Sequence, residues 1–330
     1  MKILVTGGAG FIGSNFVRNL LAGAYCSYSE IDSVSVLDNL SYAGNVENLA
    51  AVWSDPKFRF ILGDICDLEV IYPALDGQDL IVHFAAESHV DRSINDSYPF
   101  FNTNVIGTQR LLEVARKLNV STFIYVSTDE VYGTISSGSW SEDSPLLPNS
   151  PYAASKAASD LMVRSYHRTY GMDVRTTRCS NNYGPFQYPE KVIPLFVTNL
   201  IIKKPLPMYG DGSNVRDWIH VDDHCRGIWL VATRGKAGNV YNIGGRNELS
   251  NLELAETILT EMGETRSRIE FVGDRKGHDL RYSVDSSKIL AELGFEPKID
   301  FKLGLKSTID WYISNALWWK KTKGKDEKNM

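Results

Sequence analysis

Two pairs of ionisable residues near the middle of this 330-residue chain are arranged as acid–base catalysts would be. The first pair is Tyr152 and Lys156, which stand four residues apart at the start of a predicted helix and so share one face, roughly 5–6 Å apart at Cβ. A neighbouring ammonium ion favours the phenolate, so Tyr152 could remove a proton from a hydroxyl group near neutral pH. The same spacing also occurs by chance on many helices, and the pair alone leaves both interpretations open.

The second pair is Asp129 and Glu130, which directly follow a predicted strand over residues 122–128. Successive strand residues point to opposite faces, so both carboxyl groups can serve one ligand only if the backbone turns there, as Gly133 suggests. Two close carboxylates cannot both ionise cheaply, and one pKa should rise. Such a pair would supply one general acid and one general base. The alternative is a pair of solvated loop acids.

A glycine-rich segment at the N-terminus predicts a dinucleotide site. Gly7, Gly10 and Gly13 follow an apolar strand over residues 2–6 and precede a pattern of apolar residues at helical spacing. Strand, glycine turn and helix form the context in which a pyrophosphate sits on a helix N-terminus. Asp38 ends the next apolar run, near the roughly 20-residue offset of the acid that binds an adenosine ribose. Its charge would repel a 2′-phosphate, which favours NAD over NADP.

Alternating apolar runs and helical patterns predict an α/β fold with a Rossmann-type, doubly wound parallel sheet. The strands expected are 2–6, 34–37, 58–62, 80–84 and 122–127, with 240–243 returning to the sheet later. Helices are expected over 105–118 and 152–170, and Ser250 with Glu253 forms a capping box for a helix over 252–262. All the polar clusters above lie at the carboxyl ends of the strands, where ligands of such sheets bind.

The chain becomes irregular and rich in Pro and Gly after Arg178, which predicts a smaller lobe that binds substrate. We expect interleaved domains. The dinucleotide-binding domain would comprise residues 1–185 and about 215–245, and the smaller, mainly C-terminal lobe would comprise 186–214 and 246–330.

Composition excludes several classes of protein. The chain is 43% hydrophobic and 23% charged with a net charge of −5, as expected of a globular protein and not of a nucleic-acid binder. It has no run of about 20 apolar residues and no N-terminal signal peptide pattern, so we expect no membrane association. Four dispersed cysteines are typical of reduced thiols in the cytoplasm.

Two further features have ordinary explanations. His220, His224 and Cys225 lack a nearby acidic third ligand in a suitable pattern, so we expect no metal site. The lysine-rich run over residues 320–325 is expected to be a solvated tail.

Taken together, the motifs resemble the extended short-chain dehydrogenase/reductases and, within that superfamily, the dTDP-glucose 4,6-dehydratases. The resemblance runs from Met1 to about Trp319. Besides the glycine turn, it rests on residues 84–94, 127–133, 148–156, 178–185, 216–218 and 274–279. Lys276-Gly277 replaces the Pro-Gly of many relatives, which should alter loop stiffness more than contacts.

The resemblance implies dehydration of dTDP-glucose to dTDP-4-keto-6-deoxyglucose in three steps. Tyr152, assisted by Lys156, would deprotonate the C4 hydroxyl while hydride passes to NAD. The C4 ketone acidifies the C5 hydrogen, so Glu130 would take that proton while a protonated Asp129 donates to the departing C6 hydroxyl. Hydride would then return from NADH to C6, and C5 would be reprotonated. Because NAD is regenerated in each turnover, it should stay tightly bound.

The resemblance also implies the binding residues. Those expected at the cofactor are Gly7, Gly10, Phe11, Ile12, Gly13, Asp38, Asn39, Asp64, Ile65, Ala85, Ala86, Thr103, Tyr152, Lys156 and Asn182. Those expected at the sugar nucleotide are Ser88, Thr128, Asn181, Lys191, Val192, Pro207, Tyr209, Arg216, Asn251, Arg275 and His278. Thr128 would also act in catalysis, by a hydrogen bond to the hexose C4 oxygen. Arg216 and Arg275 suit a diphosphate, because guanidinium forks match phosphate oxygens.

Three alternatives remain at this stage. A UDP-hexose 4-epimerase or a UDP-glucuronate decarboxylase would share the glycine turn and the Tyr–Lys pair, but Asp129 argues against both. A non-catalytic NAD-binding protein would have lost one of the catalytic residues, and none is lost. Relatives pair the helix over 105–118 with the one after Tyr152 into a four-helix bundle, so a homodimer is expected. The pathway, cell-wall rhamnose or a secondary-metabolite deoxysugar, stays open.

Overall fold

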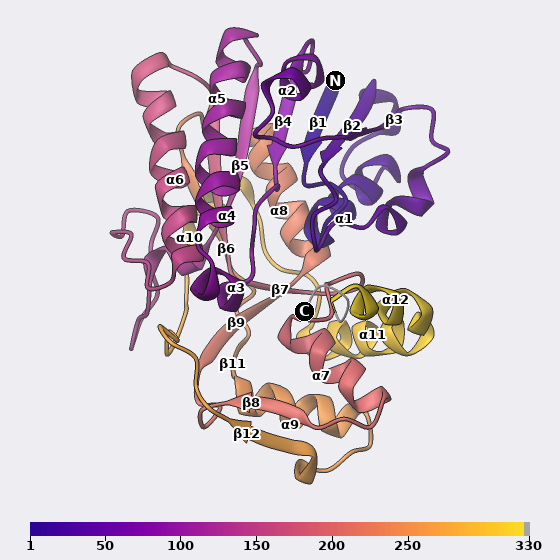
Figure 1. Cartoon of the computed structure of the whole chain (residues 1–330). Helices are drawn as coiled ribbons and strands as arrows, with labels where there is room; N and C mark the ends of the chain where they lie inside the picture. Colours follow the sequence, from indigo (N-terminus) through magenta and orange to yellow (C-terminus); the bar gives the residue numbers. More distant parts are fainter. Residues whose placement is uncertain (327–330) are drawn as a thin grey trace.

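A seven-stranded sheet forms the upper part of the protein (Figure 1), whose computed structural model describes residues 1–326. Its strands are β1 (Lys2–Thr6), β2 (Ser33–Asp38), β3 (Phe58–Leu62), β4 (Leu80–His83), β5 (Thr122–Thr128), β6 (Val174–Cys179) and β10 (Val240–Ile243). They lie in the order β10-β6-β5-β4-β1-β2-β3, and every neighbouring pair is parallel. The predicted doubly wound parallel sheet is confirmed.

One strand of this sheet was not predicted. β6 contains Arg175, Thr176, Thr177 and Arg178 and so lacks the apolar run expected of a buried strand. Arg178 is tolerated inside because it makes a bidentate ion pair with Asp160, at 2.8 Å for both contacts. Because the charge of Arg178 is paired with Asp160, β6 can be buried although its sequence is not apolar. A hydropathy pattern therefore does not reveal this strand.

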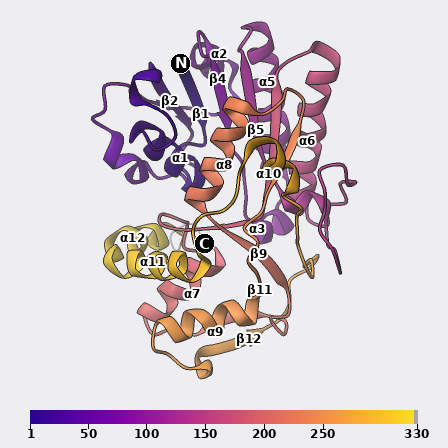
Figure 2. The same cartoon turned by 180° about the vertical axis from the view of Figure 1, so that it is seen from behind.

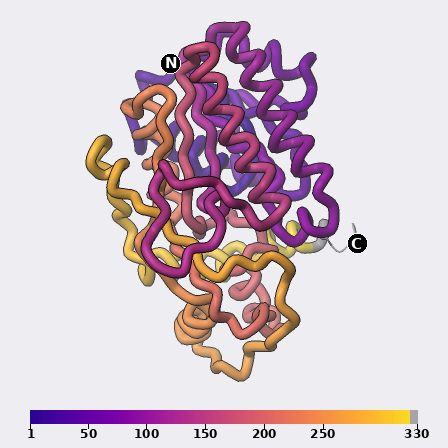
Figure 3. The backbone as a smooth tube through the Cα atoms, turned by 90° about the vertical axis from the view of Figure 1, so that its left-hand side faces the viewer, coloured from indigo at the N-terminus to yellow at the C-terminus, as the bar shows by residue number. Residues whose placement is uncertain are grey.

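Helices cover both faces of the sheet. One face carries α2 (Leu68–Leu75), α5 (Thr108–Lys117) and α6 (Pro151–Tyr170), and the other carries α1 (Phe11–Leu21), α8 (Val221–Arg234) and α10 (Ser287–Leu293). Figure 2 shows α8 and α10 from behind, and Figure 3 shows the purple α5 beside the magenta α6. Alternate strand residues serve the two cores: Ile3 and Val5 pack with α1, whereas Leu4 packs with α2 and α5.

Short elements lie in the connections between the longer helices and strands. They are η1 (Tyr28–Glu30), η2 (Val46–Val52), α3 (Val90–Asn95), α4 (Tyr98–Phe100), η3 (Phe101–Gly107), η4 (Asp129–Tyr132) and η5 (Arg266–Arg268). The helix expected over 105–118 begins as the π-helical turn η3 and continues as α5.

The lower lobe has its own small sheets and its own core. Its elements are β7 (Asn181–Tyr183), α7 (Val192–Ile201), β8 (Leu206–Tyr209), β9 (Val215–His220), β11 (Glu248–Ser250), α9 (Asn251–Glu261), β12 (Ile269–Val272), α11 (Phe301–Ser314) and α12 (Ala316–Asp326). One sheet has the order β11-β9-β7, and β8 pairs with β12. Phe196, Trp218, Leu254 and Trp319 are among the buried residues that fill the core between them. The predicted capping box of Ser250 and Glu253 is present at α9.

The lysine-rich run is not the solvated tail that was expected, because residues 320–325 belong to α12. Thr322 is buried, and Lys321 pairs with Glu47 of the upper domain. Because the run is helical, Thr322 lies on the same buried face of α12 as Trp318 and Trp319. Residues 327–330, which the sequence assigned to the substrate lobe, lie outside the described residues.

The predicted division into 1–185 with 215–245, against 186–214 with 246–330, stays a prediction. Two features of the structure bear on it. β9 pairs with β7 and β11 of the lower lobe, while α8, which directly follows it, packs on the large sheet. Ile289, Leu293 and Phe295 pack in the same upper core as α1 and α8. The chain therefore crosses between the two parts more often than the sequence indicates.

The close contact between Gly245 and β9 provides a test of this architecture. Gly245 donates its N–H to Asp217 Oδ2 at 2.7 Å, and a Cβ at this position would overlap the carbonyl oxygen of Trp218 in β9. We expect Gly245→Ala to lower the free energy of unfolding by about 1–3 kcal/mol, because the backbone of β9 must shift. Gly273→Ala is the matched control, since its Cβ would meet nothing within 4 Å. It should leave stability unchanged or raise it by up to about 1 kcal/mol. Urea denaturation of both variants decides, and equal stability would contradict the packing described.

Candidate active site

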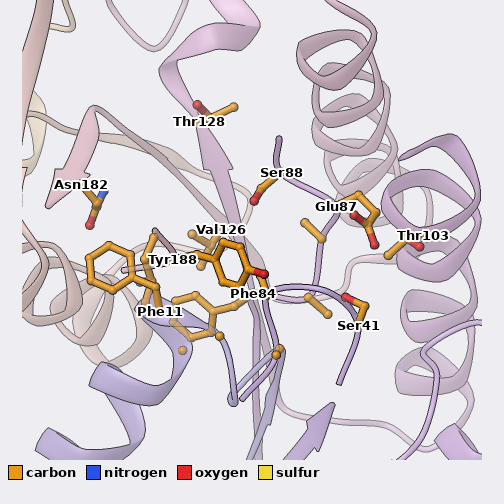
Figure 4. Close-up of a pocket in the computed structure, with 18 of the residues that line it drawn as sticks. Phe11, Ser41, Phe84, Glu87, Ser88, Thr103, Val126, Thr128, Asn182 and Tyr188 are labelled. Atoms are coloured by element: carbon orange, nitrogen blue, oxygen red, sulfur yellow. The ribbon is translucent and has the colours of Figure 1, made fainter. Parts of the chain in front are cut away.

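A deep cleft opens at the carboxyl ends of β1, β2, β4 and β5, where it also meets residues from the lower lobe. Its cavity volume is about 290 Å³, close to the lower end of the roughly 300–1,000 Å³ typical of ligand pockets. Figure 4 shows Val126 and Thr128 along one strand, with Ser41, Glu87 and Thr103 at another side of the pocket. One cleft is thus lined by the glycine turn, the acid pair and the Tyr–Lys pair.

The glycine turn forms one end of this cleft. Gly10 is the N-cap of α1 and offers no side chain to the free N–H groups of the first turn, which an anion can therefore use. Gly7 has φ 69°, and a Cβ on it would collide with the backbone of Ala85. A Cβ on Gly13 would overlap the Gly7 carbonyl oxygen. Uncapped N–H groups behind a close-packed turn fit the pyrophosphate of a dinucleotide.

Asp38 also lines this end of the cleft, opposite the glycine turn. Its two carboxylate oxygens accept hydrogen bonds from the N–H groups of Ala9, at 2.9 Å, and Leu40, at 2.8 Å. Burial raises the pKa of this carboxyl group, which the two hydrogen bonds oppose. A carboxylate held in place by the backbone can accept a further hydrogen bond from a ribose hydroxyl group.

Tyr152 and Lys156 lie in the first two turns of α6, and both line the cleft as predicted. Ser150 caps the helix by accepting a hydrogen bond from Ala153 N–H, and Pro151 takes the first helical position. Lys156 Nζ donates to the Val126 carbonyl oxygen at 2.8 Å and lies 4.3 Å from the centre of the Tyr125 ring. The end of β5 therefore fixes the position of the ammonium group.

The expected ease of ionisation of Tyr152 is wrong for the protein without ligands. Burial raises the pKa of the phenol well above its usual value, and the charge of Glu130 raises it further. Burial also lowers the pKa of Lys156 to about 8. The prediction took account only of the attraction between the phenolate and the ammonium ion. In this site, the loss of hydration of both groups has the larger effect on their pKa values.

The acid pair stands on a turn, as the sequence required. β5 ends at Thr128, whose hydroxyl oxygen accepts a hydrogen bond from Glu130 N–H at 3.3 Å and so caps η4. Gly133 ends this turn with φ 76°. Asp129 and Glu130 consequently both line the cleft instead of pointing to opposite faces.

The two carboxyl groups have different surroundings. Asp129 Oδ2 is buried without a hydrogen-bond partner among the described residues, and burial followed by the charge of Glu130 raises the pKa of Asp129 strongly. Burial also raises the pKa of Glu130, but the charges of Arg275, Lys191 and Arg216 oppose that effect. The pKa values of both groups rise, so the predicted rise is confirmed, and it is stronger at Asp129. A protonated Asp129 beside a cation-surrounded Glu130 gives an acid and a base on one turn.

Most residues predicted for the cofactor do line the cleft, and the exception is Asp64. Its carboxylate accepts hydrogen bonds from Asn39 Nδ2 at 3.2 Å and Cys66 N–H at 2.7 Å beside the cleft wall. Those lining it are Gly7, Gly10, Phe11, Ile12, Gly13, Asp38, Asn39, Ile65, Ala85, Ala86, Thr103, Tyr152, Lys156 and Asn182.

The residues predicted for the sugar nucleotide separate into two groups. Ser88, Thr128, Asn181 and Lys191 line the cleft, and Lys191 Nζ donates to the Ser88 carbonyl oxygen at 2.7 Å. The remaining predicted residues belong to the lower lobe and do not line it: Val192, Pro207, Tyr209, Arg216, Asn251, Arg275 and His278.

Part of this second group contacts Asp91 or acts on the charge of the acid pair. Arg275 lies 3.9 Å from Asp91 on α3, to which Tyr209 also donates a long hydrogen bond of 3.5 Å. Arg216 donates to the carbonyl oxygens of Asp279 and Leu280 and packs over the Tyr282 ring. Because Arg216 and Arg275 both act on the pKa of Glu130, the positive charges gather next to the acid pair.

Sequence reasoning missed several cleft residues. Ser41, Tyr42, Glu87, Gln187 and Tyr188 all line it. Tyr42 and Tyr188 meet edge to face, with ring centroids 5.5 Å apart, although 146 positions separate them (188 − 42). Glu87 lies within residues 84–94, one of the segments on which the resemblance rests. Its position in that segment is the sequence signal that could have identified it as a cleft residue. Nothing in the sequence brings the two tyrosines together.

Residues 1–326 contain neither a cluster of metal ligands nor a membrane-spanning helix. No three side chains of the kinds that bind metals gather into a site there. In the same range, no helix combines the length and the apolar character needed to cross a bilayer. His224 instead meets Asn182 Oδ1 through its Nδ1 at 2.8 Å inside the protein.

Known proteins resemble this chain over nearly its whole length. A family model described as GDP-mannose 4,6 dehydratase matches residues 4–308. A dTDP-glucose 4,6-dehydratase of Actinoplanes is 56% identical over 97% of this chain and 100% of its own. The crystal structure of a dTDP-glucose 4,6-dehydratase from Streptomyces venezuelae, with NAD bound, is 60% identical at a TM-score of 0.96 and covers 98% of this chain and 100% of that one.

A structure of another activity shows the limit of fold similarity. The UDP-glucose 4-epimerase of Thermotoga maritima matches with a TM-score of 0.87 over 96% of this chain and all of its own, at 32% identity. The fold is therefore shared across activities, whereas the high identity is to dehydratases. The match over residues 4–308, together with these relatives, shows that the chain belongs to the nucleotide-sugar 4,6-dehydratase family and, within it, to the dTDP-glucose 4,6-dehydratases.

Proposed function

We propose that this chain is a hydro-lyase that converts dTDP-glucose to dTDP-4-keto-6-deoxyglucose, with NAD as its tightly bound cofactor. The observation that carries the proposal is the buried acid–base turn of Asp129 and Glu130 in the same cleft as Tyr152 and Lys156. Relatives that are dTDP-glucose 4,6-dehydratases, one of them crystallised with NAD, support the substrate and the cofactor. The function predicted from the sequence is the same.

The cofactor would lie along the glycine turn. The N–H groups of the first turn of α1 would hold its pyrophosphate, and Asp38 would accept a hydrogen bond from the adenosine ribose. When bound, NAD supplies a hydride acceptor for C4, a hydride donor for C6 and the positive charge of its oxidised ring. The carboxylate of Asp38 would disfavour the 2′-phosphate of NADP.

Tyr152, as its phenolate, would take the proton of the C4 hydroxyl group, and Thr128 would hold the C4 oxygen through its own hydroxyl. Lys156 would support the phenolate, because its ammonium group is fixed in the same cleft. The raised pKa of Tyr152 means that the free phenol keeps its proton at neutral pH. Deprotonation of Tyr152 would therefore depend on the positive charges of Lys156 and of the oxidised NAD ring in the complete complex.

The acid pair would carry out the elimination. Glu130 would remove the C5 proton, which the C4 ketone has made acidic, while Asp129 would donate its proton to the C6 hydroxyl group as it leaves as water. The raised pKa of Asp129 favours the protonated form that this donation requires. Arg216, Arg275 and Lys191 lower the pKa of Glu130 against burial and so favour its role as the base.

The same cations would bind the diphosphate of the sugar nucleotide. Lys191 reaches the cleft from the start of α7, and Arg216 and Arg275 of the lower lobe act on the charge of the acid pair. Guanidinium groups bind phosphate oxygens through paired hydrogen bonds. We propose that Ser88, Asn181, Val192, Pro207, Tyr209, Asn251 and His278 complete the substrate site.

An epimerase of the same fold is the second candidate. It would use Tyr152 and Lys156 but has no C6 group to expel, so it would not need a buried protonated carboxyl group at position 129. A buried polar atom without a partner costs about 1–3 kcal/mol. Asp129 Oδ2 is such an atom, which favours the dehydratase.

We further propose a homodimer in the cytoplasm, without nucleic-acid or membrane partners. Ile106 on η3 and Leu161 and Tyr170 on α6 are exposed apolar residues on the side of the sheet where the two helices lie together. A second copy packed there would remove them from water. All four cysteines are free thiols, which supports a reducing compartment.

The first test is product analysis in deuterated water. We expect dTDP-glucose to give the 4-keto-6-deoxy sugar with deuterium at C5 and with the original C4 hydrogen at C6, because Glu130 exchanges its proton while the hydride does not exchange. Mass spectrometry and NMR read both positions. UDP-, GDP- and CDP-glucose should turn over more slowly. Finding a C4 epimer or no turnover would refute the proposed activity.

A second test separates the acid from the oxidation step. Asp129→Asn removes the proton donor but keeps the size of the side chain, so C4 oxidation should persist while product formation falls by about 10²–10⁴-fold. Bound NADH should then accumulate and be visible by its near-ultraviolet absorbance. The control Asp310→Asn changes an exposed carboxyl group that pairs with Lys306 on α11 and does not line the cleft, and product formation should change far less. Equal loss of oxidation and elimination in Asp129→Asn would remove Asp129 from the acid role.

A third test uses pH. The pKa of Lys156 is lowered to about 8, so the side chain is an ammonium ion below that pH and loses its charge above it. C4 oxidation in a single turnover should therefore slow as pH rises through about 8. Lys156→Arg keeps its charge over this range and should lack the alkaline decline, at a lower overall rate. An oxidation rate that keeps rising beyond pH 8 in the unmodified enzyme would contradict this role.

A further inference from the structure

The two halves of the proposed chemistry stand on different segments that meet at a small separate core. Tyr152 and Lys156 belong to α6, whereas Asp129 and Glu130 belong to the four-residue turn η4. Val131 and Tyr132 of that turn pack on Ala157, which directly follows Lys156. This core is distinct from the large cores on the two faces of the sheet. Further contacts must therefore fix the position of η4 relative to α6.

Arg178 on β6 connects these two segments through hydrogen bonds. Its Nε and Nη2 donate to the two carboxylate oxygens of Asp160 on α6, both at 2.8 Å. Its Nη1 donates to the Tyr132 hydroxyl oxygen at 2.7 Å. Arg178 and Asp160 are about 5% and 2% exposed, so water does not compete for these bonds. One guanidinium group thus binds the helix with one edge and the turn with another.

Tyr132 is also held from its other side. Its hydroxyl group donates to Asn242 Oδ1 of β10 at 2.8 Å, and Asn242 Nδ2 donates in turn to the Trp140 carbonyl oxygen at 2.9 Å. The ring stacks on Trp140, with centroids 6.2 Å apart. Burial raises the pKa of Tyr132 to about 12, so the phenol stays neutral and keeps both hydrogen bonds.

We propose that Arg178 and Tyr132 are positioning residues that fix the acid–base turn relative to the Tyr152–Lys156 helix. This inference rests on the proposed function, in which one hexose is oxidised at C4 by the helix and loses water across C5 and C6 at the turn. The same sugar ring must meet both sets of groups without moving far. Displacement of a catalytic group by about 1 Å can cost about 10²-fold in rate, so a loosened turn would impair the elimination selectively.

The test is Tyr132→Phe, which removes only the hydroxyl group and leaves the Arg178–Asp160 ion pair in place. Tyr241→Phe is a matched control: Tyr241 is equally buried and its hydroxyl also makes two hydrogen bonds, to Glu292 Oε2 and from Lys236 N–H, both at 3.0 Å. In Tyr132→Phe we expect C4 oxidation to stay within about threefold of the unmodified enzyme and product formation to fall about 10–100-fold. NADH should accumulate on Tyr132→Phe and not on Tyr241→Phe.

The outcomes separate this inference from the function on which it rests. Absence of product from the unmodified enzyme would refute the proposed function. Normal product formation by Tyr132→Phe, or equal loss of oxidation and elimination, would overturn the positioning role. Arg178→Lys gives a second reading, because it keeps the charge opposite Asp160 but loses the fork. If it folds, as judged by thermal unfolding, it should show the same selective loss of elimination, and normal elimination would again refute the role.

Discussion

The direction of the strands is the constraint on which the site depends. All pairs in the large sheet are parallel, so the ends of β1, β2, β4 and β5 open on one edge. The glycine turn, Asp38 and the acid pair each follow one of these ends. Antiparallel neighbours would have sent half of them to the opposite edge. The helix with the Tyr–Lys pair begins beside the same edge, because it crosses over from β5 to β6.

Burial at this edge then sets the proton affinities. It raises the pKa of Tyr152, Asp129 and Glu130 and lowers that of Lys156, so neutral forms are favoured throughout the cleft. Positive charges oppose this rise at both carboxyl groups, but more of them act on Glu130: Arg275, Lys191 and Arg216 act on Glu130, and Arg216 acts on Asp129. This difference in neighbouring charge favours the protonated form of Asp129 over that of Glu130.

The lower lobe is joined to the upper domain in ways that tie binding to the sheet. Asn48 donates to the Ala9 carbonyl oxygen in the glycine turn and accepts a hydrogen bond from Trp318 of α12, at 2.9 and 3.0 Å. The C-terminal helix therefore contacts the loop that supports the proposed cofactor site.

The sequence by itself determined the parallel sheet, the glycine turn, the Tyr–Lys pair and the turn at Asp129, because each depends on local periodicity or on residues next to one another. It also carried the resemblance that the comparisons confirm. Only the tertiary structure decided the strand β6, the approach of Tyr42 to Tyr188, and the helical state of residues 320–325. It also decided the direction in which the pKa of Tyr152 moves. These features depend on partners distant in the chain and on how much water burial removes, which no local pattern records.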